Sequence, residues 1–179
     1  GLEKEAGVYS ERNGYIWDEY KIPCYNIAAD HPYYYDNRLH DLPSGYHHIS
    51  IDRKQEAYFL KYYSGYKSAG FLPLAGTGLD GALDVSYEQR NIDVIMTGNY
   101  TPPSFFEQHI NWINDEYAAF YRGIIDELLE KTDQTIEEVT LRHCEREMGK
   151  VVPDDFRLVM HKMIFIDLYV RNYWRGLVI

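Results

Sequence analysis

The chain has 179 residues, of which 45% are hydrophobic, and a formal net charge of −10 at neutral pH. This length suffices for one well-packed core, and the hydrophobic fraction is that of a globular protein rather than a disordered one. The acidic balance, with a sequence pI near 5.1, argues against a nucleic acid or an anionic membrane surface as partner, because both attract basic proteins.

Membrane and secretory signals are not found in the sequence. No apolar run is long enough to span a bilayer, and no signal-peptide pattern opens the chain. The two cysteines, Cys24 and Cys144, fall in a predicted strand and a predicted helix, which is poor evidence for a disulfide framework. We therefore expect a cytoplasmic protein without a membrane span.

The first predicted strand leads directly to an Asp-His pair. Residues 13–21 are predicted as a short helix, and Cys24 to Ala29 as a strand that ends before Asp30 and His31. In an open α/β sheet, ligands bind beyond the carboxyl ends of the strands, so this pair is a candidate for catalysis. Alternatively, the aspartate caps a turn or a short helix whose first residue is Pro32.

A second strand and a helix follow. Tyr46 to Ile51 alternates in the manner of a strand and ends in Asp52. Residues 53–63 are predicted as a helix, with Ala57, Leu60 and Tyr63 on its inward face.

A third strand is predicted over Ala69 to Leu74, and a fourth over Ile92 to Met96. This alternation of strands and helices predicts an α/β fold with a mostly parallel sheet of about four strands. The carboxyl ends of parallel strands meet at one edge. The residues that follow the four strands are expected to form one rim there: Asp30, Asp52, Gly76 and Gly98.

Residues 102–179 are predicted to contain helices only. Ser104 to Glu107 has the pattern of a capping box, and the apolar stripe behind it predicts one long amphipathic helix that continues to Leu128. A second capping box, Thr135 to Glu138, opens a helix that Gly149 ends. A third helix begins at Asp154 or Asp155. The chain is thus expected to divide into an α/β part, residues 1–101, and a three-helix segment, residues 102–179.

Other polar features carry weaker signals. The chain has 18 tyrosines, which suit either stacking on a sugar ring or base or the packing of a small sheet. The histidines between His31 and His48 lack metal-ligand spacing, so no metal or cofactor is expected. The turn of Gly98, Asn99, Tyr100 and Thr101 precedes a predicted helix and is either an anion-binding site or an ordinary connection.

The order of several short motifs resembles the middle of bacterial glycosyltransferase-like proteins of the spore-maturation (CgeB) type. The resemblance runs from about residue 13 to the end of the chain. The motifs that carry it are Trp17–Pro23, Asp30-His31-Pro32, Ile51-Asp52-Arg53, Phe71–Gly76 and Ile92–Thr101.

Such proteins resemble type-B glycosyltransferases, in which two Rossmann-like domains face each other across a cleft. The resemblance implies that this chain is a piece of a longer protein: the later part of the acceptor-side domain and the helices that lead to a second domain. The implied partners are a nucleotide sugar, held mainly by that second domain, and a glycan or other hydroxyl acceptor. Asp30 or His31 is then the candidate base, with Asp52 behind them. The implied substrate-binding residues are Asp52, Gly76, Gly98, Asn99, Tyr100 and Thr101.

Other classes remain open. A non-catalytic interaction or dimerisation module is the main alternative, since an acidic, tyrosine-rich sheet with a helical hairpin also suits binding to a partner or to a second copy. A flavodoxin-like or receiver-like domain is a third reading. A receiver needs a lysine after a late strand, and none follows Met96.

Overall fold

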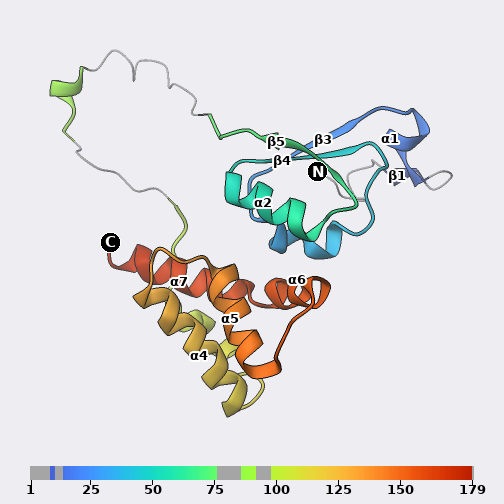
Figure 1. Cartoon of the computed structure of the whole chain (residues 1–179). Coiled ribbons are helices and arrows are strands. Elements are labelled where there is room, and N and C mark those ends of the chain that lie inside the picture. Colours follow the sequence, from blue (N-terminus) through green and yellow to red (C-terminus); the bar gives the residue numbers. More distant parts are fainter. Residues whose placement is uncertain (1–8, 11–13, 76–85, 92–97, 179) are drawn as a thin grey trace.

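The computed structural model describes residues 9–10, 14–75, 86–91 and 98–178 (Figure 1). Its main sheet has three parallel strands in the order β3 (Cys24–Ala28), β4 (Tyr46–Ser50) and β5 (Lys67–Phe71). This confirms an α/β fold with a parallel sheet. The fourth predicted strand, residues 92–96, lies outside the described residues.

Short elements connect the strands. A 3₁₀ helix, η2 (Pro32–Arg38), joins β3 to β4, and α2 (Arg53–Tyr62) joins β4 to β5. Before the sheet, β1 (Tyr9–Ser10) and β2 (Gly14–Tyr15) form an antiparallel pair, followed by α1 (Ile16–Glu19). The helix predicted over residues 13–21 is thus reduced to four residues.

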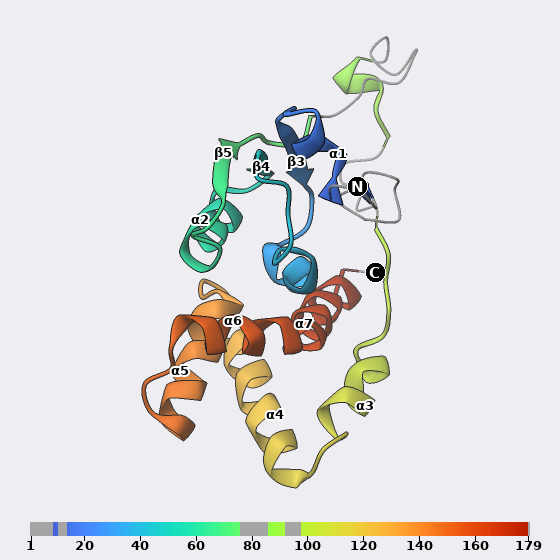
Figure 2. The ribbon, with the colours of Figure 1, turned by 90° about the vertical axis from the view of Figure 1, so that its right-hand side faces the viewer.

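The two faces of the sheet differ in burial. Figure 2 shows α2 and η2 on the face that looks toward the C-terminal helices, and there Tyr46 and His48 are buried. The imidazole of His48 stacks on the ring of Phe59 in α2, with the ring centroids 3.9 Å apart. On the opposite face, the side chains of Tyr25 and Ile27 remain 60% and 54% exposed.

The inward face of α2 was predicted correctly only at Tyr63, which is buried. Ala57 and Leu60 are exposed, whereas Tyr58, Phe59 and Tyr62 are buried. The aromatic side chains bury more apolar surface than alanine or leucine, and they pack against η2 and the helical segment, which the periodicity of α2 alone does not reveal.

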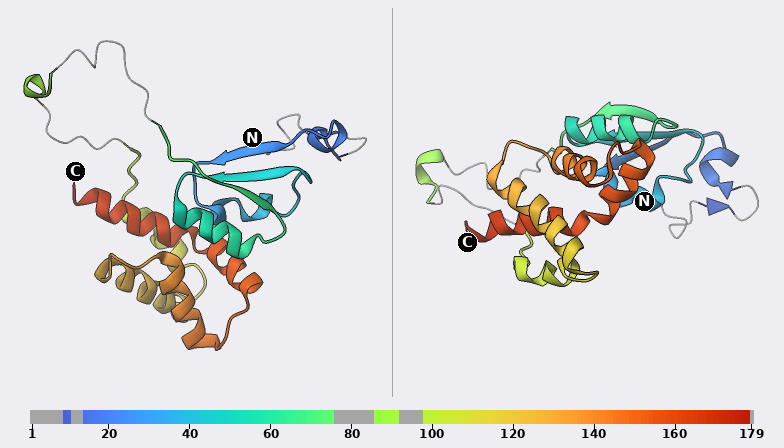
Figure 3. Two further views of the ribbon diagram at one scale, coloured as in Figure 1. Left: turned by 45° about the horizontal axis from the view of Figure 1, so that its top comes forward. Right: turned by 60° about the horizontal axis from the view of Figure 1, so that its bottom comes forward.

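The helices of residues 102–179 pack against one another and against the α/β part. In chain order they are η5 (Pro103–Phe106), α3 (Glu107–Ile110), α4 (Asp115–Glu130), α5 (Ile136–Met148), α6 (Pro153–Lys162) and α7 (Ile164–Gly176). A short 3₁₀ helix, η4 (Tyr87–Gln89), precedes them. Figure 3 shows α4 and α5 side by side, with α7 packed against α4.

Two of the three predicted helices are interrupted. The first ends at Ile110 and restarts at α4, where the Asn114 side chain caps the new helix by accepting a hydrogen bond from the Tyr117 N–H. Ile113 and Tyr117, which the stripe placed inward, are about half exposed. The predicted cap at Ser104 does not form, because a 3₁₀ turn begins at Pro103 instead.

The signals for the middle helix are confirmed. Thr135 and Glu138 form the capping box of α5, and Gly149 ends that helix with a φ of 78°. This positive φ favours glycine because it has no Cβ. The third predicted helix is divided at Met163 into α6 and α7.

One buried carboxylate joins the helical segment to the α/β part. Asp36 of η2 is 2% exposed and accepts hydrogen bonds from the Tyr63 hydroxyl, at 2.7 Å, and from the Arg157 guanidinium of α6. Burial alone raises the pKa of Asp36, but the bonds from Tyr63, Arg157 and His40 outweigh it and leave the pKa below its ordinary value. The two parts also share one apolar core, in which Phe156 and Met160 are buried together with the tyrosines of α2.

No helix among the described residues is long and apolar enough to cross a membrane.

We expect Asp36→Asn to lower the free energy of unfolding by about 3 kcal/mol, because it leaves the Arg157 guanidinium inside the protein without its counter-ion. Urea unfolding followed by circular dichroism measures this loss. The same substitution at Asp155, an exposed residue in the first turn of α6, is the control. A loss at Asp36 no larger than at Asp155 would contradict the role given to this carboxylate.

Candidate functional site

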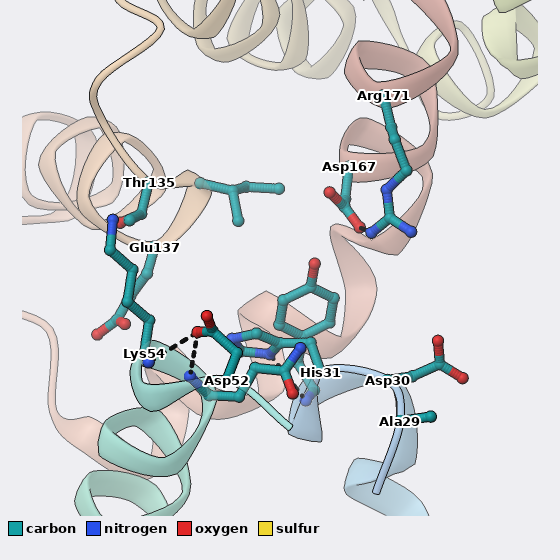
Figure 4. Close-up of a pocket in the computed structure, with 12 residues that line it drawn as sticks. Ala29, Asp30, His31, Asp52, Lys54, Thr135, Glu137, Asp167 and Arg171 are labelled. Atoms are coloured by element: carbon teal, nitrogen blue, oxygen red, sulfur yellow. Dashed lines mark hydrogen bonds and ion pairs between the residues drawn. The ribbon is translucent and has the colours of Figure 1, made fainter. Parts of the chain in front are cut away.

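A pocket of about 320 Å³ lies at the carboxyl ends of β3 and β4, between the α/β part and the helical segment (Figure 4). The α/β part contributes Asp30 and His31 after β3, and Asp52 with Lys54 at the start of α2. The parallel pairing of β3 with β4 brings Asp30 and Asp52 to one edge of the sheet, as the sequence predicts, whereas Lys54 was not predicted there.

The opposite walls come from two helices of the C-terminal segment. Thr135 is the N-cap of α5 and Glu137 lies in its first turn, and Asp167 and Arg171 belong to α7. No sequence pattern indicated any of these as a site residue. The spacing of Asp167 and Arg171, four apart on one helix, is the one local signal for this pair, since such residues face each other.

Asp52 has both a structural role and an unused oxygen. It is the N-cap of α2, and its Oδ1 accepts hydrogen bonds from the backbone N–H groups of Lys54, at 2.7 Å, and Gln55, at 3.2 Å. Its Oδ2 has no hydrogen-bond partner among the described residues. Half of this carboxylate is therefore available to a ligand in the pocket.

Asp30 lies at the margin of the pocket. Its side chain is exposed, and its Oδ2 accepts a hydrogen bond from the Tyr35 hydroxyl at 2.9 Å. In Figure 4 its carboxylate lies apart from those of Asp52 and Asp167. Of the two aspartates, Asp52 is thus nearer to the other polar groups of the pocket.

His31 is placed to donate a hydrogen bond rather than to accept a proton. Its Nδ1 accepts a hydrogen bond from the Tyr33 backbone N–H at 3.4 Å and so caps η2, with Pro32 as the first residue of that helix. The ring packs against the rings of Tyr33 and Tyr58. Burial lowers the pKa of His31 to about 4. The ring is therefore neutral at pH 7 and carries its proton on Nε2, which makes His31 a poor general base.

The wall formed by α7 is an ion pair held by a tyrosine. The Asp167 Oδ2 accepts hydrogen bonds from the Arg171 Nη2 and from the Tyr34 hydroxyl, the latter at 2.5 Å. Burial and the nearby Asp167 carboxylate raise the pKa of Tyr34, so its hydroxyl stays protonated and donates to Asp167.

On the wall formed by α5, the carboxylate is likewise bonded to a cationic side chain and a tyrosine hydroxyl. The Glu137 Oε1 accepts hydrogen bonds from the Lys61 ammonium, at 2.6 Å, and from the Tyr62 hydroxyl, at 2.9 Å. The Lys54 side chain extends toward Thr135 (Figure 4).

The segment Gly98–Thr101 does not line this pocket. The Thr101 N–H donates to the Asn172 Oδ1 at 2.9 Å, and the Asn99 carbonyl accepts from the Arg175 Nη1 at 2.7 Å, so the segment packs on the C-terminal half of α7. The Tyr100 ring lies against Gly176, where a Cβ would come within 2.9 Å of the hydroxyl oxygen. Of the residues predicted to form one rim after the four strands, Asp30 and Asp52 therefore lie together at the edge of the sheet, and Gly98 does not. Gly76 lies outside the described residues.

Within the described part of the chain, no group of three or more His, Cys, Asp or Glu side chains is arranged to hold a metal ion. Comparisons of the chain with protein-family models, with curated proteins and with solved structures found no match. The pocket itself therefore carries the functional argument.

The low pKa of His31 predicts a loss of stability in mild acid. Between about pH 6.5, the ordinary histidine pKa, and pH 4, the unfolded chain binds a proton that the folded protein does not, so the free energy of unfolding falls as the pH falls. His31→Asn keeps a short acceptor for the Tyr33 N–H but does not titrate. We expect the variant to lose about 1 to 2 kcal/mol less than the wild type between pH 7 and pH 5.

Urea unfolding at several pH values measures this difference. The buried His48, whose pKa burial also lowers to about 4, contributes the same slope to both proteins and cancels in the comparison. Parallel curves for the wild type and His31→Asn would contradict the prediction.

Proposed function

We propose that the chain is the acceptor-side part of a glycosyltransferase of the spore-maturation-like, type-B class, with a Rossmann-like α/β unit whose pocket binds the acceptor hydroxyl. The observation that carries this proposal is the position of the pocket at the carboxyl edge of a parallel sheet, the usual place of ligands in α/β folds. The order of motifs in the sequence agrees with it. In this proposal the nucleotide sugar is bound mainly by a second domain.

Asp52 is the base in this proposal. Glycosyl transfer with inversion needs a group that removes the proton of the acceptor hydroxyl as the new bond forms. The free Oδ2 of Asp52 accepts that proton, while the bonds from the Lys54 and Gln55 N–H groups hold the carboxylate in place. The His31 Nε2–H is a donor in the same pocket and helps to orient the acceptor.

Asp52→Asn tests this role without disturbing the helix cap, since asparagine caps helices as well as aspartate does. We expect the variant to keep its thermal unfolding midpoint and to lose about 100-fold or more in transfer rate, because the amide cannot take up the proton. The rate is measured as nucleotide released from a nucleotide sugar in the presence of acceptor, with the complete protein that includes the proposed second domain.

Asp154→Asn is the matched control, since it removes a carboxylate from the first turn of another helix, α6, away from the pocket. Transfer at the wild-type rate by Asp52→Asn would overturn the assignment of the base. If Asp30→Asn alone abolished transfer, the base would be Asp30 instead.

One observation favours the alternative, an interaction or dimerisation module. Parallel sheets are usually covered on both faces, yet Tyr25 and Ile27 of β3 expose more than half of their surface on the open face. In this alternative a second copy of the chain covers that face. Light scattering would then show a doubled mass, and Tyr25→Ser would restore the mass of one chain. A single-chain mass at all concentrations would dismiss the alternative.

A further inference from the structure

The carboxylates of the pocket divide into those paired with a cation of the protein and those without such a partner. Asp167 and Glu137 belong to the first kind, because one oxygen of each accepts hydrogen bonds from a cationic side chain and from a tyrosine hydroxyl. Arg171 and Lys61 also neutralise their charges. The two carboxylates therefore form walls and position their partners, and they add little net charge to the pocket.

Among the groups that keep free bonding capacity, two lie on opposite sides of the pocket. Both hydrogen bonds of Arg171, to Asp167 and to the Tyr34 hydroxyl, use Nη2. Its Nη1 and Nε have no hydrogen-bond partner among the described residues. Across the pocket lies the free Oδ2 of Asp52 (Figure 4). Free N–H donors thus face a free carboxylate acceptor.

We infer that this pocket selects an uncharged, hydroxylated ligand, a saccharide unit of one or two rings, and that Arg171 is a specificity-determining residue positioned by Asp167 and Tyr34. The inference rests on the proposed function, since it describes the acceptor of that same site. It also assigns a binding role to α7. Asp167 of this helix and Tyr34, which donates a hydrogen bond to it, are 133 residues apart in the chain.

The chemistry of the hydroxyl group supports an uncharged ligand. A hydroxyl donates and accepts at once, so neighbouring hydroxyls on one sugar ring satisfy Asp52 as acceptor and Arg171 as donor. The Asp167 carboxylate largely balances the charge of Arg171, so the unpaired charges of the pocket are those of Asp30, Asp52 and Lys54. A carboxylate or phosphate on the ligand meets the like charges of Asp52 and Asp30. An ammonium group meets the like charge of Lys54 and has no lone pair to accept a hydrogen bond from Arg171. Each charged class thus leaves one group of the pocket unsatisfied, which costs affinity.

The size of the pocket limits the ligand. A volume of about 320 Å³ is at the lower end of the range for small-molecule sites, about 300–1,000 Å³. One or two sugar rings fit this volume.

Matched ligands test the inference by binding alone, with the chain as it is. Methyl glucoside, methyl glucuronide and methyl glucosaminide share one ring, and each charged analogue differs from the glucoside at a single position, where a carboxylate replaces the hydroxymethyl group or an ammonium replaces a hydroxyl. Each is titrated into labelled protein, and its affinity is taken from amide chemical shifts in nuclear magnetic resonance spectra. We expect the neutral glucoside to bind about tenfold or more tightly than either charged analogue, which corresponds to one hydrogen bond to a charged group.

Variants test the role of Arg171. Arg171→Met should weaken binding of the neutral sugar about tenfold and reduce the discrimination against the glucosaminide, because the donor that an ammonium group cannot satisfy is gone. Arg146→Met, at an exposed position of α5 outside the pocket, should change neither. If Asp167 acts only through Arg171, then Asp167→Asn should weaken binding in the wild type but have no further effect in Arg171→Met.

Each outcome decides the inference. Equal or tighter binding of the glucuronide, no binding of any of the three sugars, or unchanged affinities in Arg171→Met overturns it. The proposed function fails separately. If neutral sugars bind as expected and Asp52→Asn keeps the wild-type transfer rate, the proposed transferase function is wrong and the inferred saccharide site stands. If Asp52→Asn loses transfer and the glucuronide binds tightly, the transferase function stands and the inferred ligand class is wrong.

Discussion

Parallel pairing of β3 with β4 is the constraint on which the candidate site depends. Cys24 lies opposite Tyr46 and Ala28 opposite Ser50, so the two strands run in step and end together. Asp30 and Asp52 each lie two residues beyond the end of their strand and therefore share one edge. An antiparallel pair would have placed them at opposite ends of the sheet.

The helical segment turns this edge into a pocket. The bonds of Asp36 with Arg157, of Tyr34 with Asp167 and of Lys61 with Glu137 link the α/β part to α6, α7 and α5. The last two of these links also form pocket walls, so stability and site geometry are coupled. A change that loosens the docking of α7 removes Arg171 from the pocket even when the sheet is intact.

Local capping decides what the loop residues can do chemically. His31 caps η2 through Nδ1, and Asp52 caps α2 through Oδ1. Each cap uses one heteroatom of the side chain and leaves the other, an N–H on His31 and an oxygen on Asp52. The sequence presents capping by Asp30 as the alternative to a catalytic role, but the residue that caps η2 is His31. Capping leaves one polar atom of His31 and one of Asp52 available to a ligand.

The sequence by itself determined the elements whose signals are local: the strands at Cys24 and Tyr46, the helix that Asp52 opens, and the cap at Thr135. Alternation and capping act over a few residues, so they can be read along the chain. Only the tertiary structure decided that Tyr58 rather than Leu60 faces inward, that Gly98 packs on α7, and that Arg171 joins Asp52. These outcomes depend on contacts between residues far apart in the chain, which no local pattern encodes.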